Sequence, residues 1–186
     1  PLKVVRAASM VAAIWGRWDV AVGLLLAFHT LLRPGELSSL RRTHLRLPDD
    51  EDWSAAVGVV CIMKPKTARK GARVQHVTIT DPVLLAALWA VVGHLPASAK
   101  LLSGNLVDLS RFFAQICAAL QLPPSTFTLA SLRAGGATHD YLTFGNVPRL
   151  QFRGRWDAPG TLNHYVQEAT VVMAQATLPA ETRALR

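Results

Sequence analysis

Two short strand-like segments lie in the middle of a chain whose other apolar segments have helical spacing. Residues 55–63 (AAVGVVCIM) form a β-rich run, and residues 74–79 (VQHVTI) alternate between apolar and polar side chains. The polar, basic connection between them, residues 64–73 (KPKTARKGAR), has Gly71 as its turn residue. Strands joined by so short a connection pair as an antiparallel hairpin. The sequence therefore predicts a mainly helical α+β domain with a small antiparallel sheet inserted after the first helices.

Proline and glycine residues separate the helical segments. Residues 2–32 have apolar side chains close to 3.6-residue spacing and are expected to form two helices, split near Gly16. A further helix is expected to begin at Pro34 and to end before Pro48, because proline is tolerated in a first helical turn. After the hairpin, the pattern predicts helices at 82–94, 106–120, 131–141, 147–152 and 161–175.

The composition supplies enough apolar material for one hydrophobic core. Of the 186 residues, 51% are hydrophobic and 17% are charged, which argues against an intrinsically disordered chain. Domains commonly contain about 100 to 200 residues, so residues 1–186 are expected to form a single domain. Because the chain begins with Pro1 and not with Met, it is interpreted as a fragment of a longer protein.

The charge balance favours a polyanionic partner. Twenty Lys and Arg residues against twelve Asp and Glu residues give a formal net charge of +8. Nucleic acid is the first partner that such a balance indicates, although ribosomal and membrane-surface proteins share it. A function therefore has to be argued from motifs.

Metal sites, disulfides and membrane spans are not expected. Cys61 and Cys117 fit neither a disulfide framework nor a zinc-ligand pattern, and the six histidines are scattered. The most apolar run, residues 20–32, is shorter than the roughly 20 residues that a bilayer requires. The sequence predicts no metal, no cofactor and no membrane partner.

Two segments in the first half of the chain combine basic residues with helix or turn signals. Arg33 and Glu36 stand three residues apart in LLRPGEL, where the ordinary interpretation is a surface ion pair. Lys66 lies with Lys64 and Lys70 in the basic connection of the hairpin, where the ordinary interpretation is a solvated turn. Taken singly, neither segment indicates a function.

Two segments in the second half are more informative. Arg133 lies in SLRAGGAT, where small residues allow close packing and a buried charge needs a partner. A structural clamp on a carbonyl or carboxylate is its ordinary role. Trp156, in RGRW, stands nine residues before Tyr165, which borders the apolar stripe of the last expected helix. An aromatic residue there is ordinarily core packing with a wet hydroxyl.

In this order the segments resemble the catalytic domain of the tyrosine recombinases, the phage-integrase-like family, over about residues 19–168. LLRPGEL matches the motif of the family's first arginine, and the K-T pair at Lys66 matches its hairpin lysine. Arg133 closes the family's H-x-x-R motif, in which Ala130 takes the place of the histidine. Trp156 and Tyr165 reproduce the family's nine-residue spacing before the nucleophile. GRW and LRAGGAT look most like eukaryotic and mobile-element members.

The resemblance implies DNA strand breakage and rejoining through a 3′-phosphotyrosyl intermediate. Two arginines would hold the non-bridging phosphate oxygens, a lysine would protonate the leaving 5′-oxygen, and an indole N–H would donate to the phosphate. A glutamate would orient an arginine or the backbone. In this chain the implied residues are the nucleophile Tyr165, the arginines Arg33 and Arg133, the acid Lys66, the donor Trp156 and the supporting Glu36.

Ala130, in place of the motif histidine, is the reason for an alternative interpretation of the function. A missing imidazole removes one donor and a candidate base for Tyr165, which His139 or His164 would have to replace. The chain is therefore either an active recombinase or a catalytically impaired relative that still binds DNA. A basic helical protein of unrelated function is the third interpretation.

The resemblance also implies partners and location. Double-stranded DNA is the expected partner, contacted by Lys64, Arg69, Lys70, Arg153 and Arg155. The apolar C-terminal segment is expected to mediate self-association on DNA. The protein is expected to be intracellular and DNA-associated, in the nucleus if eukaryotic. The separate N-terminal domain with which this family clamps DNA is not expected within residues 1–186.

Overall fold

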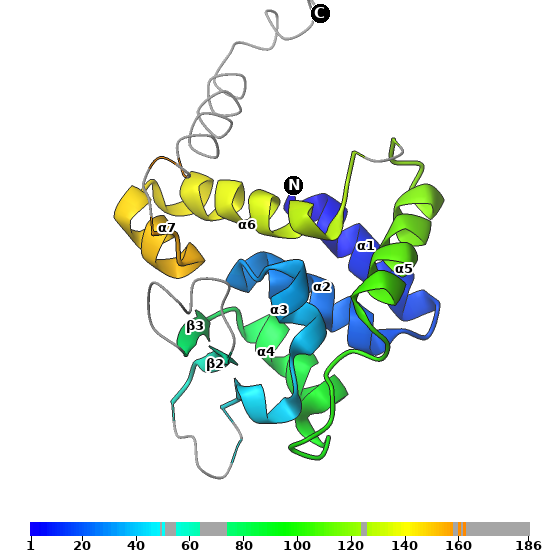
Figure 1. Ribbon diagram of the computed structural model, residues 1–186, viewed down its shortest axis with the longest axis horizontal. Coiled ribbons are helices and arrows are strands. Elements are labelled where there is room, and N and C mark those ends of the chain that lie inside the picture. Colours follow the sequence, from blue (N-terminus) through cyan, green and yellow to red (C-terminus); the bar gives the residue numbers. More distant parts are fainter. Residues whose placement is uncertain are drawn as a thin grey trace, which may run out of the picture.

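The computed structural model describes residues 1–48, 50, 55–63, 74–123, 126–157, 160 and 162. A small sheet lies at one edge of the molecule, beside its helices (Figure 1). The helical elements are α1 (Leu2–Ile14), α2 (Trp18–Thr30), α3 (Pro34–Ser39), the 3-10 turn η1 (Arg42–His44), α4 (Pro82–Leu88), the π-helical turn η2 (Trp89–Gly93), α5 (Leu106–Ala119), α6 (Leu129–Phe144) and α7 (Val147–Gly154). The strands are β1 (Leu45–Arg46), β2 (Gly58–Ile62) and β3 (Gln75–Ile79).

Helix α2 is the centre of the core. It is apolar on nearly every side and packs against α1, α4 and α6. The expected split from α1 is confirmed at Gly16, whose φ of +77° favours glycine. Helix α6 approaches α2 closely at Gly136, where an added Cβ would lie 2.2 Å from the carbonyl oxygen of Phe28. Glycine at this position therefore allows backbone to pack on backbone.

The expected hairpin is confirmed. Strands β2 and β3 pair antiparallel with Val60 opposite Val77, and β1 adds a third strand with Leu45 opposite Val60. Alternate residues of β2 are buried, which fixes the face that it turns to the core. The basic connection at residues 64–73 lies outside the described residues.

The helix expected between Pro34 and Pro48 is shorter than expected. Helix α3 ends at Ser39, and Leu40 has extended backbone. The chain then exchanges backbone hydrogen bonds with residues 97–101, since Arg42 N–H donates to Ala99 O at 2.9 Å and Leu101 N–H donates to Leu40 O at 3.0 Å. These tertiary bonds replace the helical ones, and the short strand β1, which the sequence did not predict, follows.

The remaining described helices agree with the sequence apart from their ends. The segment 82–94 forms α4 and then the π-helical turn η2. Helix α6 begins at Leu129 and reaches Phe144, beyond the expected 131–141, and stops at Gly145 with φ +61°. The expected helix 161–175 lies outside the described residues except for Leu162.

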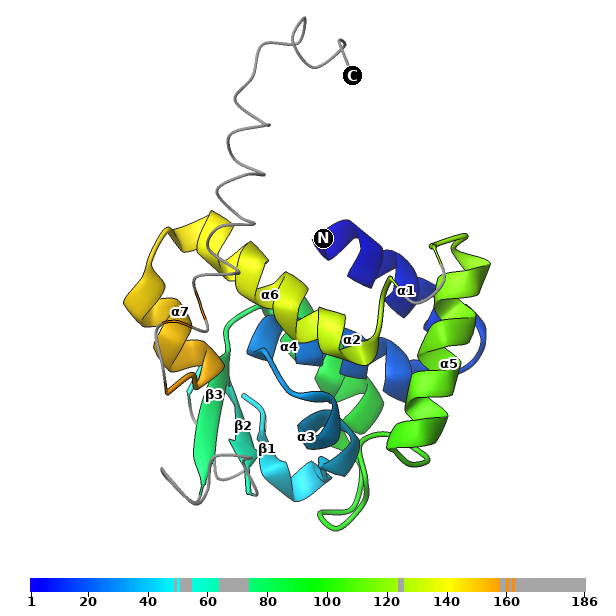
Figure 2. The same ribbon diagram turned by 45° about the horizontal axis from the view of Figure 1, so that its top comes forward.

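The arrangement places three distant segments together. Helix α6 crosses above the end of α2 and the start of α3, while α7 lies beside β3 (Figures 1 and 2). Within the described part of the chain, no helix combines the length and hydropathy that a membrane crossing requires. The junction of α2, α3, α6 and α7 contains four of the residues that the sequence singled out, Arg33, Glu36, Arg133 and Trp156.

Candidate functional site

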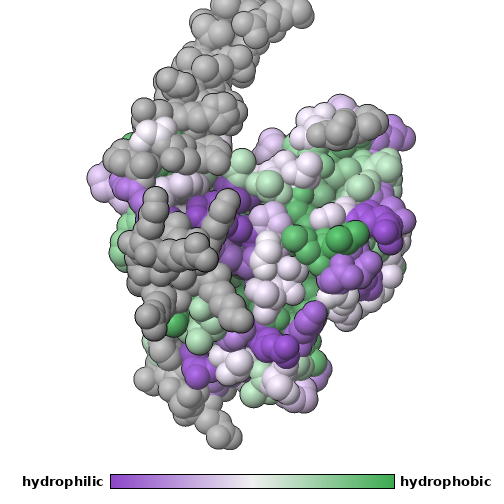
Figure 3. Space-filling model, viewed as in Figure 1, coloured by the Kyte–Doolittle hydropathy of each residue, from purple (hydrophilic) through white to green (hydrophobic). Residues whose placement is uncertain are grey.

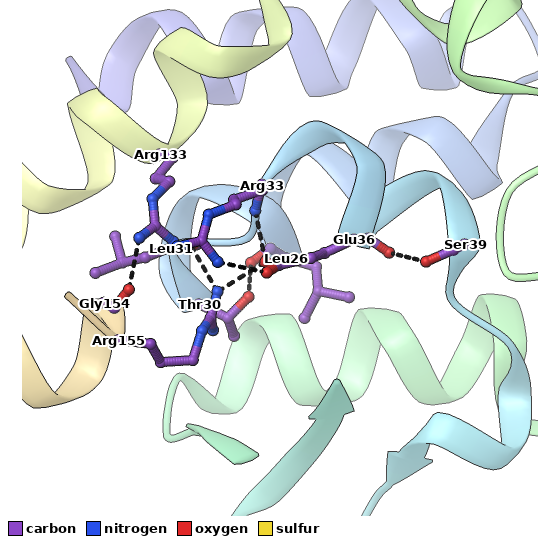
Figure 4. A network of polar contacts seen from close by, with 9 residues as sticks. All are labelled: Leu26, Thr30, Leu31, Arg33, Glu36, Ser39, Arg133, Gly154 and Arg155. Carbon is purple, nitrogen blue, oxygen red and sulfur yellow. Dashed lines mark hydrogen bonds and ion pairs between the residues drawn. The ribbon is translucent and has the colours of Figure 1, made fainter. Parts of the chain in front are cut away.

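The backbone turn between α2 and α3 is the centre of this junction. Leu31 caps α2 in the left-handed conformation, with φ 55° and ψ 39°. Its carbonyl oxygen accepts hydrogen bonds from two side chains distant in sequence, Arg133 Nη1 and Arg155 Nη2, the second at 3.3 Å (Figure 4). A carbonyl at a helix end has no intrahelical partner, and these two guanidinium groups satisfy it.

Arg33 and Glu36 form a local pair at the start of α3. Arg33 is the N-cap residue, with Pro34 in the first helical position. Glu36 accepts hydrogen bonds from Arg33 Nη1 and from the Arg33 backbone N–H, both at 2.8 Å. The Arg33 side chain is 23% exposed and that of Glu36 is 6% exposed. Glu36 therefore contacts both the side chain and the backbone of Arg33, and its orienting role in a phosphate site stays a prediction.

Arg133 is buried in α6 and reaches two different segments. Besides the carbonyl of Leu31, its Nη2 donates to Gly154 O, at the end of α7, at 2.6 Å. Its guanidinium carbon lies 4.3 Å from the ring centroid of Trp156. Carbonyl oxygens and an aromatic face together compensate for burying the cation.

Gly154 is required for the position of Trp156. A Cβ on Gly154 would lie 1.6 Å from Cζ3 of the Trp156 ring, so only glycine leaves room for the indole. The Trp156 backbone N–H donates to Gln151 O at 3.1 Å, and Gln151 Nε2 donates to Trp156 O at 3.1 Å. The Trp156 ring therefore lies in this position over the Arg133 guanidinium.

Arg153 and Arg155, which the sequence predicted to contact DNA, point into the protein. Arg153 Nη2 donates to His29 O at 2.7 Å, and its Nε lies 3.3 Å from Asp140. Arg155 Nη2 donates to Glu36 Oε2 at 2.7 Å, and its side chain is 5% exposed. Burial lowers the pKa of both guanidinium groups, while Asp140 and Glu36 oppose that shift. Their direct contact with DNA stays a prediction.

A pocket of about 560 Å³ opens between β3 and α7. Trp156 and Arg155 line it from one side, and Val74, Gln75 and His76 line it from the other. Val74 is the first described residue after the basic connection. In Figure 3, hydrophilic surface lies below the position that α6 has in Figure 1.

Ala130 and His139 lie apart on α6. Ala130 is exposed in the first turn of the helix. His139 is half-buried nine residues later, with its ring centroid 5.5 Å from that of Phe28 and 6.5 Å from that of His29. Burial lowers the pKa of His139 and of His29. His139 belongs to the contact between α2 and α6.

The remaining chemistry-bearing residues are placed as follows. Burial raises the pKa of Cys61 and Cys117, so both thiols have little thiolate character. Among the described residues, no group of three or more His, Cys, Asp or Glu side chains is arranged to hold a metal ion. The predicted site residues outside the described part of the chain are Lys64, Lys66, Arg69, Lys70 and Tyr165, as is His164.

Solved recombinase structures have the same arrangement of elements. The XerA recombinase aligns with a TM-score of 0.72 at 14% identity, covering 96% of this chain and 63% of that one. The XerH site-specific recombinase, bound to its palindromic difH substrate after cleavage, aligns with a TM-score of 0.69 at 13% identity, covering 94% and 50%. The chain has the fold of the tyrosine recombinase catalytic domain.

A transposon integrase extends the comparison. The Tn1549 integrase in complex with transposon right end DNA aligns with a TM-score of 0.67 at 14% identity, covering 96% of this chain and 65% of that one. This chain therefore spans half to two thirds of the length of these recombinases. No protein-family model matches the sequence, and a comparison with curated proteins finds no match.

Sequence reasoning missed two features of the site. The first is the Leu31 carbonyl, which no side-chain motif reports. The second is the contact of Arg155 with Glu36, since the two residues are 119 positions apart. The segment RGRW did contain a signal for Arg155. The residue that follows α7 has left-handed backbone, which favours glycine, yet this position holds Arg155 and the glycine stands one position earlier.

Proposed function

We propose that this chain breaks and rejoins DNA strands through a 3′-phosphotyrosyl intermediate, with Tyr165 as nucleophile. The observation that carries the proposal is the joining of Arg33 and Arg133 around one turn, through Glu36, Arg155 and the Leu31 carbonyl, in a fold shared with recombinases. These two arginines are 100 residues apart in the sequence. A phosphate site needs two such cations in one place, because together they neutralise its non-bridging oxygens.

Leu162 supports the assignment of Tyr165. Leu162 is fully buried in a cluster with Leu31, Ala137 and Leu150, beside the turn that the arginines hold. Three residues of chain span at most about 11 Å. Chain length alone therefore permits a residue at position 165 to reach the arginine cluster, which supports the proposed role of Tyr165.

Each of the proposed site residues has its own role in the reaction. The Tyr165 hydroxyl gives up its proton to water or a neighbouring base, and its oxygen forms a bond to phosphorus as the bond to the 5′-oxygen breaks. Lys66 supplies the proton that the leaving 5′-oxygen takes up. Arg33 and Arg133 stabilise the negative charge that builds on the non-bridging oxygens. A free 5′-hydroxyl then reverses the step and releases the tyrosine. The phosphotyrosyl bond conserves the energy of the broken strand, so rejoining needs no further energy source.

The second candidate is a DNA-binding relative with little catalytic activity. Ala130 provides no imidazole, and Arg133 uses Nη1 and Nη2 on backbone carbonyls. Each of these nitrogens has a second N–H, so a phosphate would share the Arg133 guanidinium with the two carbonyls. The missing imidazole and this sharing favour a slow enzyme over a fast one.

Covalent trapping on nicked duplex DNA tests the proposal. A nick beside the scissile phosphate lets the short 5′-hydroxyl fragment diffuse away, so the phosphotyrosyl adduct accumulates and is read on a denaturing gel. We expect an adduct with the natural chain and none with Tyr165→Phe, whose DNA affinity stays unchanged. Binding without any adduct supports the second candidate, and an adduct that persists in Tyr165→Phe rules out Tyr165.

Restoring the motif histidine separates the two candidates further. Ala130→His should raise the rate of adduct formation at neutral pH, by up to about 10²-fold if no other group has taken over the role. Ala130→Gln is the matched control, since it adds a donor of similar size without a base. An equal gain in both variants would show that a donor, and not a base, was missing.

Self-association on DNA is a separate proposal. The segment after Leu162 contains apolar residues that need burial, and we infer that it docks on a neighbouring copy on DNA. A chain ending at Ala176 should bind one duplex normally and fail to pair two duplexes in a gel-shift assay. Normal pairing by the truncated chain would exclude this docking.

A further inference from the structure

Arg155 adopts a backbone conformation that side chains seldom take. It follows α7 in the left-handed region, with φ 58° and ψ 47°. For a residue with a Cβ this conformation costs about 1 kcal/mol or more relative to glycine. Gly154 stands one position earlier, where it makes room for the ring of Trp156. The position that would tolerate glycine best is thus occupied by an arginine.

The Arg155 side chain connects the surroundings of both predicted phosphate-binding arginines. Its Nη2 lies 2.7 Å from Glu36 Oε2, and Glu36 holds Arg33 through its other oxygen at 2.8 Å. The same Nη2 lies 3.3 Å from the Leu31 carbonyl, which also accepts from Arg133. Figure 4 shows this bridge from Arg33 to Arg133.

The bridge changes the net charge of the cluster formed by Arg33, Glu36, Arg133 and Arg155. If Glu36 had Arg33 as its only partner, one carboxylate would offset the one guanidinium nearest to it. With Arg155 on the same carboxylate and Arg133 beside it, three cations face one anion, a formal excess of two positive charges. An oxyanion is the ligand that such an excess favours in a partly buried site.

We propose that Arg155 is a positioning residue for the phosphate site: it offsets the charge of Glu36 and fixes the spacing of Arg33 and Arg133. The inference rests on the proposed function, which supplies the phosphate. Arg155 acts through Glu36 and the Leu31 carbonyl, and its buried guanidinium does not need to touch DNA. The left-handed backbone at position 155 is the strain that this arrangement retains.

Glycine and asparagine are the informative substitutions because both tolerate the left-handed conformation. Arg155→Gly removes the guanidinium and relieves backbone strain, so the melting temperature should hold while the rate of single-turnover adduct formation falls about 10²-fold. Arg155→Asn should behave alike. Arg155→Lys keeps the charge without the planar fork and should recover part of the rate. Arg111→Ala, an exposed arginine on α5, is the control and should leave the rate unchanged.

Two further readouts separate positioning from other roles. Arg155→Gly should lower the rate much less in a Glu36→Gln background, because the carboxylate through which Arg155 acts is gone. The slope of log affinity against log salt should stay the same in Arg155→Gly. A slope reduced by about 0.9 would mean that Arg155 binds a phosphate directly, and equal rate losses in both backgrounds would mean that Glu36 is not the intermediary. Either result overturns the positioning role.

A measurement without DNA distinguishes this inference from the proposed function. Side-chain ¹⁵N relaxation of the free protein should show Arg33 and Arg133 restrained in the natural chain and more mobile in Arg155→Gly. Unchanged mobility of both overturns the inference even if the chain proves to be an active recombinase. Increased mobility supports it even if the natural chain forms no adduct, in which case the catalytic proposal fails alone.

Discussion

Arg33 and Arg133 have the same side chain and the same proposed task, and the protein holds them by different means. Arg33 pairs with a carboxylate three residues away and keeps 23% of its side chain exposed. Arg133 is buried, donates to carbonyls that lie 102 and 21 residues away, and lies against an aromatic ring. The first arrangement is local and electrostatic, whereas the second is assembled from three segments of the fold.

Because the two arginines are held differently, their removal should affect the stability of the fold differently. Removing Arg33 should leave the fold nearly intact, because Arg155 still satisfies Glu36. Removing Arg133 should weaken the junction of α2, α6 and α7, because two carbonyls lose a charged donor. A loss of activity therefore means something different at each arginine, and stability measurements have to accompany activity measurements.

Arg133→Ala should give the largest loss of stability. Hydrogen bonds from a charged donor contribute about 1.5 to 3 kcal/mol each, and some water will replace them, so the free energy of unfolding should fall by about 3 kcal/mol. The melting temperature should then fall by about 6 to 12 °C. Urea unfolding of the free chain measures the first quantity. A loss below about 1 kcal/mol would show that Arg155 and water satisfy the two carbonyls well enough without Arg133.

Gly154→Ala tests the aromatic part of the Arg133 environment. The new methyl group would occupy the place of the Trp156 ring, 1.6 Å from Cζ3, so the indole has to leave Arg133. Overpacking of this kind costs about 1 to 3 kcal/mol. Gly35→Ala in α3 is the matched control, since nothing lies within 4 Å of its added Cβ. Equal stability of the two variants would contradict the packing described for Trp156.

Arg33→Ala should have the opposite balance of effects to Arg133→Ala, with a small loss of stability and a large loss of activity. We expect the free energy of unfolding to fall by about 1 kcal/mol or less, because the pair is partly exposed and local. Adduct formation on nicked DNA should fall about 10²- to 10³-fold, as for the loss of one oxyanion donor. Arg33→Lys should keep the stability and recover only part of the rate. A large loss of stability in Arg33→Ala would remove the contrast with Arg133.

Acid should weaken the contact between α2 and α6 by a smaller amount. Burial lowers the pKa of His29 and His139 in the folded protein, although Asp81 and Asp140 oppose the shifts. The unfolded chain therefore binds more protons below a pH of about 6.5, and stability should be lost as the pH falls through that region. The urea midpoint at pH 7.5 and pH 5.5 measures this. His29→Gln with His139→Gln should flatten the dependence, and an unchanged slope would assign it to other groups.

Local signals in the sequence were sufficient for most of the elements. Gly16 separates α1 from α2, Pro34 and Glu36 mark the start of α3, and alternation marks the hairpin. The end of α3 was wrong because its backbone bonds with residues 97–101, and no local pattern reports such a partner. Short-range propensity gives way where tertiary hydrogen bonds compete.

The site divides in the same way. The pairing of Glu36 with Arg33 follows from a spacing of three residues, so the sequence predicted it. The contact between Arg155 and Glu36 depends on how α7 meets α3, and the burial of Arg155 depends on the same packing. The family resemblance predicts which residues belong to the site, whereas the fold shows which of the described residues contact one another.

The close approach at Gly136 determines which part of this site can move. Where the backbone of α6 lies directly on that of α2, there is no layer of side chains that could slide or reorient. We therefore expect the Leu31 turn and the α6 backbone at Arg133 to move together. Helix α7 is attached to them by Leu150, which is fully buried in one cluster with Leu31 and Ala137, and by hydrogen bonds of Arg133 and Arg155. Any movement of α7 away from α2 and α6 would thus have to expose Leu150 and break these hydrogen bonds together.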